Sequence, residues 1–267
     1  MLIDAFADDW IELLVARAAD LTPSKHLYIL LDGAFVPGLH KILAADRKAL
    51  MFASLPGCTE QTEDVSPFIF LFLPADKNLR ALLRRCERWP MVSAIETSET
   101  LQGLANRLSA WCVVEADGQR FNFRFTDTRR LPAIFGTLKP EQRAWITGPA
   151  GRWSFIGRGG RWLNLDVISS SEGLATDPKL DALQFAALVE DSFADELMAL
   201  LVDRGHDLFR YPSKAYALVN AAVHTASKAK LNEQHLVDWC EWLWVNGQSL
   251  DNTAAALALA TWRNTYE

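Results

Sequence analysis

The sequence has few of the residues and motifs on which common metal and catalytic sites depend. None of its four cysteines forms a C-x-x-C pair: they are Cys58, Cys86, Cys112 and Cys240. This spacing argues against a zinc site and against a thioredoxin-like redox motif. The five histidines share no metal-ligand spacing, and the chain lacks a G-x-x-x-x-G-K-[ST] phosphate loop, a G-x-S-x-G nucleophile elbow and an H-E-x-x-H zinc motif. We therefore expect no cofactor, no metal ion and no enzyme activity.

A membrane span and a secretion signal are also missing from the sequence. No apolar stretch approaches the roughly 20 residues needed to cross a bilayer. The chain begins Met1-Leu2-Ile3-Asp4 and has two further aspartates by Asp9, without the basic flank and apolar segment of a signal peptide. We expect a cytoplasmic protein with reduced thiols and no membrane partner.

Positive charge is scarce in the C-terminal part. Residues 1–171 carry 20 Lys and Arg against 19 Asp and Glu, whereas residues 172–267 carry 7 against 14, which together give the net charge of −6. Sequence-independent nucleic-acid binding needs a basic surface that displaces counterions from phosphates, so we expect no nucleic-acid partner. An acidic part is typical of a solvated surface, and it also suits a protein partner of complementary charge.

The N-terminal part alternates between strand-like and helix-like patterns. Four continuous apolar stretches have the length of strands buried on both faces: 27–31, 68–73, 91–95 and 111–114. Helical patterns lie between or beside them at 39–45, 78–88 and 98–108. This alternation predicts an α/β fold with a mixed, partly parallel sheet and flanking helices. Turn residues predict two hairpins, one across Asp117-Gly118 and one across Gly159-Gly160, which add antiparallel pairs.

The C-terminal part is helical throughout. The small polar residues Ser169–Gly173 form the predicted linker that precedes it. Asp177 and Pro178 suit the N-cap and first position of a helix that runs to about Asp203. Three further periodic segments follow at 213–229, 232–246 and 251–264, with Gly205 and Gly247 as stop signals. We therefore predict an α/β domain over residues 1–168 and an all-α domain over residues 174–267.

The segment 121–131, F-N-F-R-F-T-D-T-R-R-L, combines a half-buried strand with charged side chains. Alternation places its phenylalanines on one face and Arg124 on the other. Asp127 follows where the strand pattern becomes helical, a position that suits a helix N-cap. Upstream, Asp32 and Gly33 end the apolar stretch 27–31 in a predicted turn.

These two segments resemble the L-D-G-A and F-R-F-x-D-P-R-x-L signatures of bacterial type VI secretion effector adaptors, also called effector chaperones. The resemblance covers a core of about residues 26–147, and residues 233–251 are similar to the C-terminal helical region of these proteins. The chain departs from the pattern at Thr128, where proline is usual. The motif positions are Asp32, Gly33, Arg124, Asp127 and Arg129.

The resemblance implies a function as well as a fold. Such adaptors are non-enzymatic proteins that bind one secreted effector and load it onto the spike of the secretion machine. The partners implied are a cognate toxic effector and the C-terminal region of a VgrG spike protein, in some cases through a PAAR tip.

Asp32 and Asp127 are open to two interpretations. As carboxylates near strand ends they fit an acid/base pair or a divalent-cation site, so the alternative function is a small α/β hydrolase or nucleotide-binding enzyme. Their turn and cap contexts favour a structural role instead. In that case we expect Arg124 to pair internally with Asp32 or Asp127 and to join two segments of the fold.

Two clusters outside these motifs are candidates for partner binding. The helix predicted at 77–88 has leucines on one side and basic residues on the other, among them Arg84 and Arg85, which suits a solvated face or an acidic partner surface. Further along the chain, Trp239 and Trp242 share a helix face that Trp244 does not. We expect one of these tryptophans at the surface or at an interface, unless that helix packs on two sides.

Overall fold

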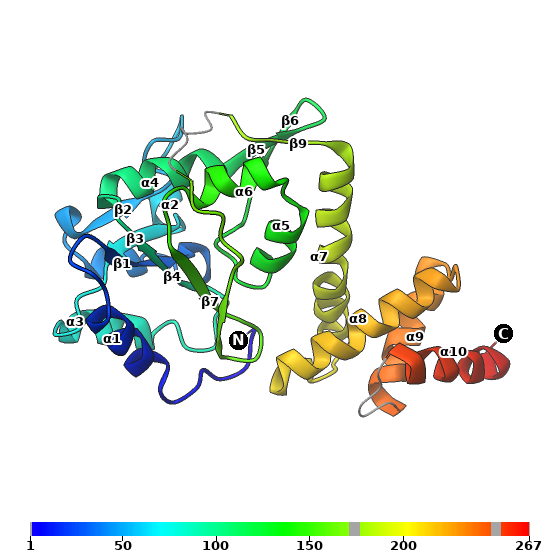
Figure 1. Cartoon of the computed structure of the whole chain (residues 1–267). Coiled ribbons are helices and arrows are strands. Elements are labelled where there is room, and N and C mark those ends of the chain that lie inside the picture. The colour runs from blue at the N-terminus through cyan, green and yellow to red at the C-terminus, as the bar shows by residue number, and fades with distance from the viewer. Residues whose placement is uncertain (1, 171–176, 247–251, 267) are drawn as a thin grey trace. The chain divides into compact units, whose positions relative to one another are not determined.

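The computed structural model describes residues 2–170, 177–246 and 252–266. The chain divides into two units, Met1–Leu188 and Val189–Glu267 (Figure 1). Each unit folds around a core of its own. The predicted linker Ser169–Gly173 lies partly outside the described residues, so the predicted division into 1–168 and 174–267 stays a prediction. The N-terminal unit extends to Leu188 because residues 179–188 pair with it and pack on it.

A six-stranded antiparallel sheet forms the centre of the N-terminal unit. Its strand order is β2-β3-β1-β4-β7-β8, and each neighbouring pair is antiparallel. The strands are β1 (His26–Leu31), β2 (Lys48–Leu50), β3 (Phe68–Leu71), β4 (Val92–Thr97), β7 (Arg152–Ile156) and β8 (Trp162–Asn164). The hairpin predicted across Gly159-Gly160 is confirmed as β7–β8, and Gly160 has the positive φ of 69° that its turn requires.

Both faces of this sheet are buried under helices. Along β1, Tyr28 and Leu30 belong to one core cluster, while Leu27, Ile29 and Leu31 belong to the other. The first cluster includes side chains of α4 (Leu101–Ser109), α5 (Leu131–Thr137) and α6 (Pro140–Thr147). The second includes side chains of α1 (Trp10–Ala19) and α3 (Lys77–Arg84). Burial on two faces explains the continuous apolar strands that suggested parallel pairing, although the main sheet is antiparallel.

A small second sheet has the order β6-β5-β9 and supplies the one parallel pair among the described strands. Its strands are β5 (Val113–Ala116), β6 (Gln119–Asn122) and β9 (Lys179–Leu180). The predicted hairpin is confirmed, with positive φ angles of 49° at Asp117 and 70° at Gly118. The fold is thus α/β with antiparallel and parallel pairs, as the sequence predicts.

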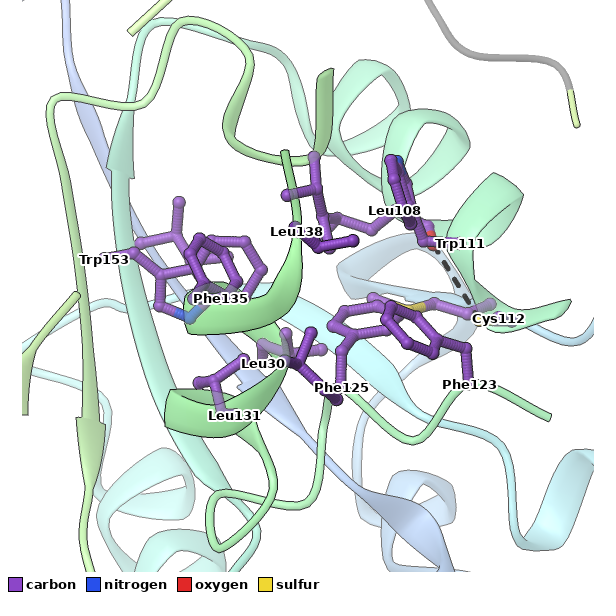
Figure 2. Packing of buried hydrophobic residues seen from close by; sticks show 14 of the residues in the cluster. Leu30, Leu108, Trp111, Cys112, Phe123, Phe125, Leu131, Phe135, Leu138 and Trp153 are labelled. Atoms are coloured by element: carbon purple, nitrogen blue, oxygen red, sulfur yellow. Dashed lines mark hydrogen bonds between the residues drawn. The ribbon is translucent and has the colours of Figure 1, made fainter. Parts of the chain in front are cut away.

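The phenylalanine segment differs from its prediction in one respect. The strand β6 ends at Asn122, earlier than the predicted Phe125. Phe123 and Phe125 nevertheless lie in the same buried cluster, together with Trp111, Phe135 and Trp153 (Figure 2). The amide of Phe123 donates to the Cys112 carbonyl at 2.9 Å, which continues the pairing with β5 by one residue. The amide of Phe125 donates to the Phe123 carbonyl at 2.8 Å, so the chain turns there.

The helix predicted at residues 39–45 differs from the structure in type. Residues 39–45 contain the 3-10 helices η2 (Leu39–Ile42) and the start of η3 (Ala45–Arg47) instead of an α-helix, although Leu39 and Leu43 are buried as a helical spacing requires. The other short elements of this unit are η1 (Gly33–Phe35), α2 (Glu60–Asp64) and η4 (Ala110–Cys112).

The C-terminal helices follow the predicted order, but the first of them begins later than predicted. The helix α7 (Ala182–Asp203) begins at Ala182, not at Asp177-Pro178, because Lys179–Leu180 form β9. Asp181 accepts from the Gln184 amide at 2.9 Å while Gln184 accepts from the Asp181 amide at 3.1 Å, which is a capping box. Gly205, with φ of 95°, ends the helix as predicted.

The remaining helices form the core of the C-terminal unit. They are η5 (Leu208–Arg210), α8 (Pro212–Lys228), α9 (Glu233–Asn246) and α10 (Asn252–Tyr266), while the predicted stop at Gly247 lies outside the described residues. Small residues of α8, such as Ala215 and Ala222, are fully buried against Leu243 and Trp239 of α9. In the part of the chain that the structure describes, every helix is too short or too polar to cross a bilayer.

Candidate functional site

The first motif segment ends β1 in a tight turn. Asp32 is the N-cap of η1, and its Oδ1 accepts from the Ala34 amide at 3.0 Å. The Asp32 amide donates to the Met91 carbonyl at 3.1 Å, which ties the turn to the residue before β4. A Cβ atom on Gly33 would overlap the carbonyl oxygen of Ser66. Glycine is therefore required here by the close approach of a neighbouring backbone.

The second motif segment is bound to the first through the Asp32 carboxylate. Its Oδ2 accepts from Arg124 Nη2 and from Thr126 Oγ1, both at 3.0 Å. The predicted Arg124–Asp32 pair is therefore present. The Asp32 residue is 2% exposed, whereas the side chain of Arg124 is 42% exposed. A buried carboxylate thus receives three donors, and one of them extends toward solvent.

Asp127 has a different role from the predicted helix N-cap. The N-cap of α5 is Arg130, and Asp127 lies three residues earlier in a turn. Its carboxylate accepts from the amide and Nε of its near neighbour Arg129 at 3.0 and 3.1 Å, and from Nη2 at 2.7 Å. The helix begins later because Pro132 favours its first turn.

Thr128 stands where the adaptor motif usually has proline, and its backbone amide has a partner. Its amide donates to the Pro90 carbonyl at 2.9 Å. Proline has no amide hydrogen, so it would remove this bond between the second motif segment and the chain before β4. Three separate segments, around residues 32, 90 and 127, therefore meet where β1 ends and β4 begins.

Phe35 and Trp89 lie at the same place, and the sequence analysis predicted neither. The guanidinium carbons of Arg124 and Arg129 lie 5.2 and 5.7 Å from the centre of the Phe35 ring. The Phe35 ring stacks on Trp89 with centroids 6.0 Å apart and planes at 27°. Both aromatic residues are half-buried. We call this set, Phe35, Trp89, Arg124 and Arg129, the arginine–aromatic patch. Its two arginines are motif positions, whereas the only sequence signal for its aromatic residues was the place of Phe35 directly after L-D-G-A.

The polar groups at the site are engaged within the fold. Both motif carboxylates are 2% exposed, and each accepts hydrogen bonds from an arginine of the second motif segment. A cavity of about 110 Å³ beside Asp32 is lined by Arg124, Thr126 and Cys112. Burial raises the pKa of the Cys112 thiol to about 12, so it is protonated at neutral pH and is a poor nucleophile. Among the described residues, no group of three His, Cys, Asp or Glu side chains could hold a metal ion.

Arg84 and Arg85 lie at the C-terminal end of α3. The three leucines of this helix, Leu79, Leu82 and Leu83, are fully buried, as the sequence predicts. Both arginines are exposed and form no ion pair within the described part of the chain. Their role in binding a partner stays a prediction.

The three tryptophans of α9 differ in burial. Trp239 is fully buried and donates its Nε1 hydrogen to the Ala222 carbonyl at 3.2 Å. Trp242 stacks on it with ring centroids 5.6 Å apart and planes at 20°, which confirms that the two share a helix face. Trp242 and Trp244 are each half-buried against the core of the C-terminal unit. Their role at an interface is also still a prediction.

Residues 27–144 match the family described as a domain of unknown function, DUF4123. The match begins in β1, ends in α6 and includes both motif segments, the arginine–aromatic patch and the end of α3. It covers less than half of the chain, and the C-terminal unit with its tryptophans lies outside it. No curated protein and no solved structure matched the chain.

Proposed function

We propose that this protein is a cytoplasmic adaptor of a type VI secretion system. It binds a specific effector before export and brings that effector to the C-terminal region of a VgrG spike protein, either directly or through a PAAR tip. The function consists of binding, and no bond is made or broken.

The match of residues 27–144 to DUF4123 is the observation that carries this proposal, since that family is known in type VI effector adaptors. The matched segment contains the L-D-G-A turn and the F-R-F-x-D segment, which meet through the Arg124–Asp32 pair. The resemblance in sequence and the contact in space thus concern the same residues.

The chemistry of the arginine–aromatic patch supports binding to a protein. Arginine and aromatic side chains are over-represented among residues that contribute most to protein interfaces. The Phe35 ring lies near two guanidinium groups, and the carboxylates of Asp32 and Asp127 limit where these groups can point. A prepositioned guanidinium loses little conformational entropy when it binds a carboxylate of a partner.

An enzyme that used Asp32 and Asp127 would first have to break these pairs. Asp32 would lose donors from Arg124 and Thr126, and Asp127 would lose Arg129. No observation on the described residues favours such a rearrangement.

Co-purification with the proteins encoded by neighbouring genes tests the proposal. The tagged full chain is co-expressed with a neighbouring toxin candidate and, separately, with a neighbouring VgrG protein. We expect a stable complex with the toxin and a ternary complex with the spike. If the folded chain captures neither protein, and instead acts on a small molecule, the adaptor function is wrong.

Charge reversal at Arg84 and Arg85 tests whether the C-terminal end of α3 contacts the effector. Both side chains are exposed, so the Arg84→Glu/Arg85→Glu variant should fold normally. Rim charges steer encounter, and we expect slower association at low salt with little change at high salt. The matched control is Arg84→Lys/Arg85→Lys, which keeps the charge. Equal rates for both variants at low salt would place this helix end outside the interface.

A further inference from the structure

The C-terminal unit has two surface hollows of nearly equal size and opposite charge. One, of about 460 Å³, lies between α8 and α10 and has the basic side chains His224, Lys228 and Arg263 in its lining, with no carboxylate among the lining residues. The other, of about 450 Å³, lies along α9 and contains Asp238, Glu241 and Trp242, with Trp262 of α10 opposite. We call the second hollow the aromatic–acidic groove.

The groove runs along one stripe of α9. His235, Asp238, Trp242 and Val245 follow one another at spacings of three or four residues, which places them on one face of the helix. Val245 is 64% exposed at one end of this stripe. The face is open to a partner over about three helical turns, at 3.6 residues per turn.

The aromatic part of the groove is held in place by the core. Trp239 is fully buried and anchored by its hydrogen bond to the Ala222 carbonyl. Trp242 stacks on the Trp239 ring, and the Trp262 ring centroid lies 5.8 Å from that of Trp239 with the two planes at 55°. His235 contacts the Trp262 ring edge to face, with centroids 6.2 Å apart. A ligand that stacks on Trp242 therefore meets a ring that is already fixed.

The two carboxylates of the groove are not equivalent. Glu241 is held by His206 at 2.7 Å and by Arg204 at 2.8 Å, and these bonds lower its pKa, so it is ionised at neutral pH. Asp238 is 3.7 Å from Arg204, and half of its side chain is exposed. Asp238 is thus the carboxylate with most freedom to take a new partner, one helical turn before Trp242.

We infer that the aromatic–acidic groove binds an arginine side chain of the protein partner, with its guanidinium stacked on Trp242 and paired with Asp238. This inference rests on the proposed adaptor function. A planar guanidinium can lie on a tryptophan face and still donate from its edge to a carboxylate beside the ring, because its N–H groups point outward in the guanidinium plane. A lysine ammonium offers no flat face, and an acidic side chain would be repelled. The basic hollow between α8 and α10 has the wrong charge for the same ligand.

Short capped peptides test the groove without the effector. Ac-Gly-Arg-Gly-amide, its lysine analogue and its glutamate analogue are titrated into the ¹⁵N-labelled full chain, and the tryptophan indole signals are followed by NMR. We expect the arginine peptide to shift the Trp242 indole signal, the lysine peptide to bind about two- to five-fold more weakly, and the glutamate peptide not to bind. Equal shifts with all three peptides, or no shift with arginine, would overturn the inference.

Four variants separate the groove from the fold. Asp238→Asn keeps the shape of the side chain and should weaken arginine-peptide binding about two- to five-fold, and Trp242→Leu should weaken it at least as much. Trp244→Leu, in the same helix but outside the groove lining, and Lys228→Gln, in the basic hollow, are the controls and should bind as the wild type does. If Trp242→Leu does not fold, the binding of the arginine peptide to Asp238→Asn is the deciding measurement. An Asp238→Asn variant with unchanged binding would overturn the pairing.

Capture of the effector by the wild type and by the variants distinguishes failure of this inference from failure of the proposed function. If the wild type captures the neighbouring effector and Asp238→Asn and Trp242→Leu capture it equally well, the groove is not the contact, while the adaptor function stands. If arginine peptides bind in the groove as expected but no neighbouring effector is captured, the adaptor proposal fails and the arginine site remains.

Discussion

The guanidinium of Arg124 lies 3.0 Å from the carboxylate of Asp32, although 92 residues separate them in the sequence. This contact joins the turn after β1 to the segment after β6. It is also asymmetric, because the Asp32 side chain is 3% exposed and the Arg124 side chain 42%.

The asymmetry predicts unequal effects of the two alanine variants on stability. Asp32→Ala removes the acceptor for Arg124, Thr126 and the Ala34 amide, and should lower the free energy of unfolding by about 1–3 kcal/mol. Arg124→Ala removes a solvent-screened pair and should cost at most about 1 kcal/mol. Urea denaturation of both variants measures the difference. Equal losses would mean that the Arg124–Asp32 pair, and not the bonds from Thr126 and the Ala34 amide, accounts for most of the stability that Asp32 contributes.

Gly33→Ala should destabilise the fold through a steric clash. The new methyl group would overlap the Ser66 carbonyl oxygen, and forced overpacking of this kind costs about 1–3 kcal/mol. Gly136→Ala in α5 is the matched control, because a Cβ there meets no atom within 4 Å. Helix propensity predicts a neutral effect or a gain of up to about 1 kcal/mol for the control. Thermal unfolding of the pair tests the claim, which fails if Gly33→Ala is as stable as the wild type.

Asp127 should stabilise its turn through both charge and hydrogen bonding. Asp127→Ala removes the acceptor for the Arg129 amide and the ion pair, with an expected loss of about 1–3 kcal/mol. Asp127→Asn keeps one acceptor oxygen and should lose less. Denaturation midpoints in low and high salt separate the two contributions, and an Asp127→Ala variant as stable as the wild type would refute the structural role.

Cleavage in the predicted linker Ser169–Gly173 should nick the chain without separating its parts. Small polar segments are preferred cleavage sites. The C-terminal fragment would retain Lys179–Leu180, which pairs with β5, and Phe185, whose ring lies 4.6 Å from that of Phe121. Gln184 adds hydrogen bonds to Gln142 and to the Thr137 carbonyl. Limited proteolysis followed by size-exclusion chromatography should yield both fragments in one peak, and a C-terminal fragment that elutes alone would contradict this packing.

Glu241 should contribute stability at neutral pH that is lost in acid. Hydrogen bonds from His206 and Arg204 hold its folded pKa below the ordinary value of 4.5. Because the unfolded chain then binds the proton more tightly, the contribution is present in full above about pH 4.5 and falls as pH drops through the folded pKa. Unfolding of the wild type and Glu241→Gln is compared at about pH 6 and about pH 3. The stability difference between them should shrink in acid, and a difference that is constant or grows would assign the effect to another group.

The sequence alone determined the local structure where a single pattern had a single solution. The leucines at 79, 82 and 83 could form only the buried side of one helix, and Asp117-Gly118 could form only a tight hairpin turn. Asp32 and Gly33 were placed in a turn for the same reason, since both residues favour turn geometry. The Arg124–Asp32 pair was one of two internal pairs left open by the charges, and the structure selects it.

Tertiary structure decided what depends on neighbours distant in the sequence. Apolar runs such as Leu27–Leu31 are buried on both faces in parallel and antiparallel sheets alike, so strand direction was set by which strands became neighbours. The start of α7 moved to Ala182 because Lys179–Leu180 found β5 as a partner. Phe35 and Trp89 joined the two motif arginines only through folding, since no periodic pattern links residues that meet across three segments.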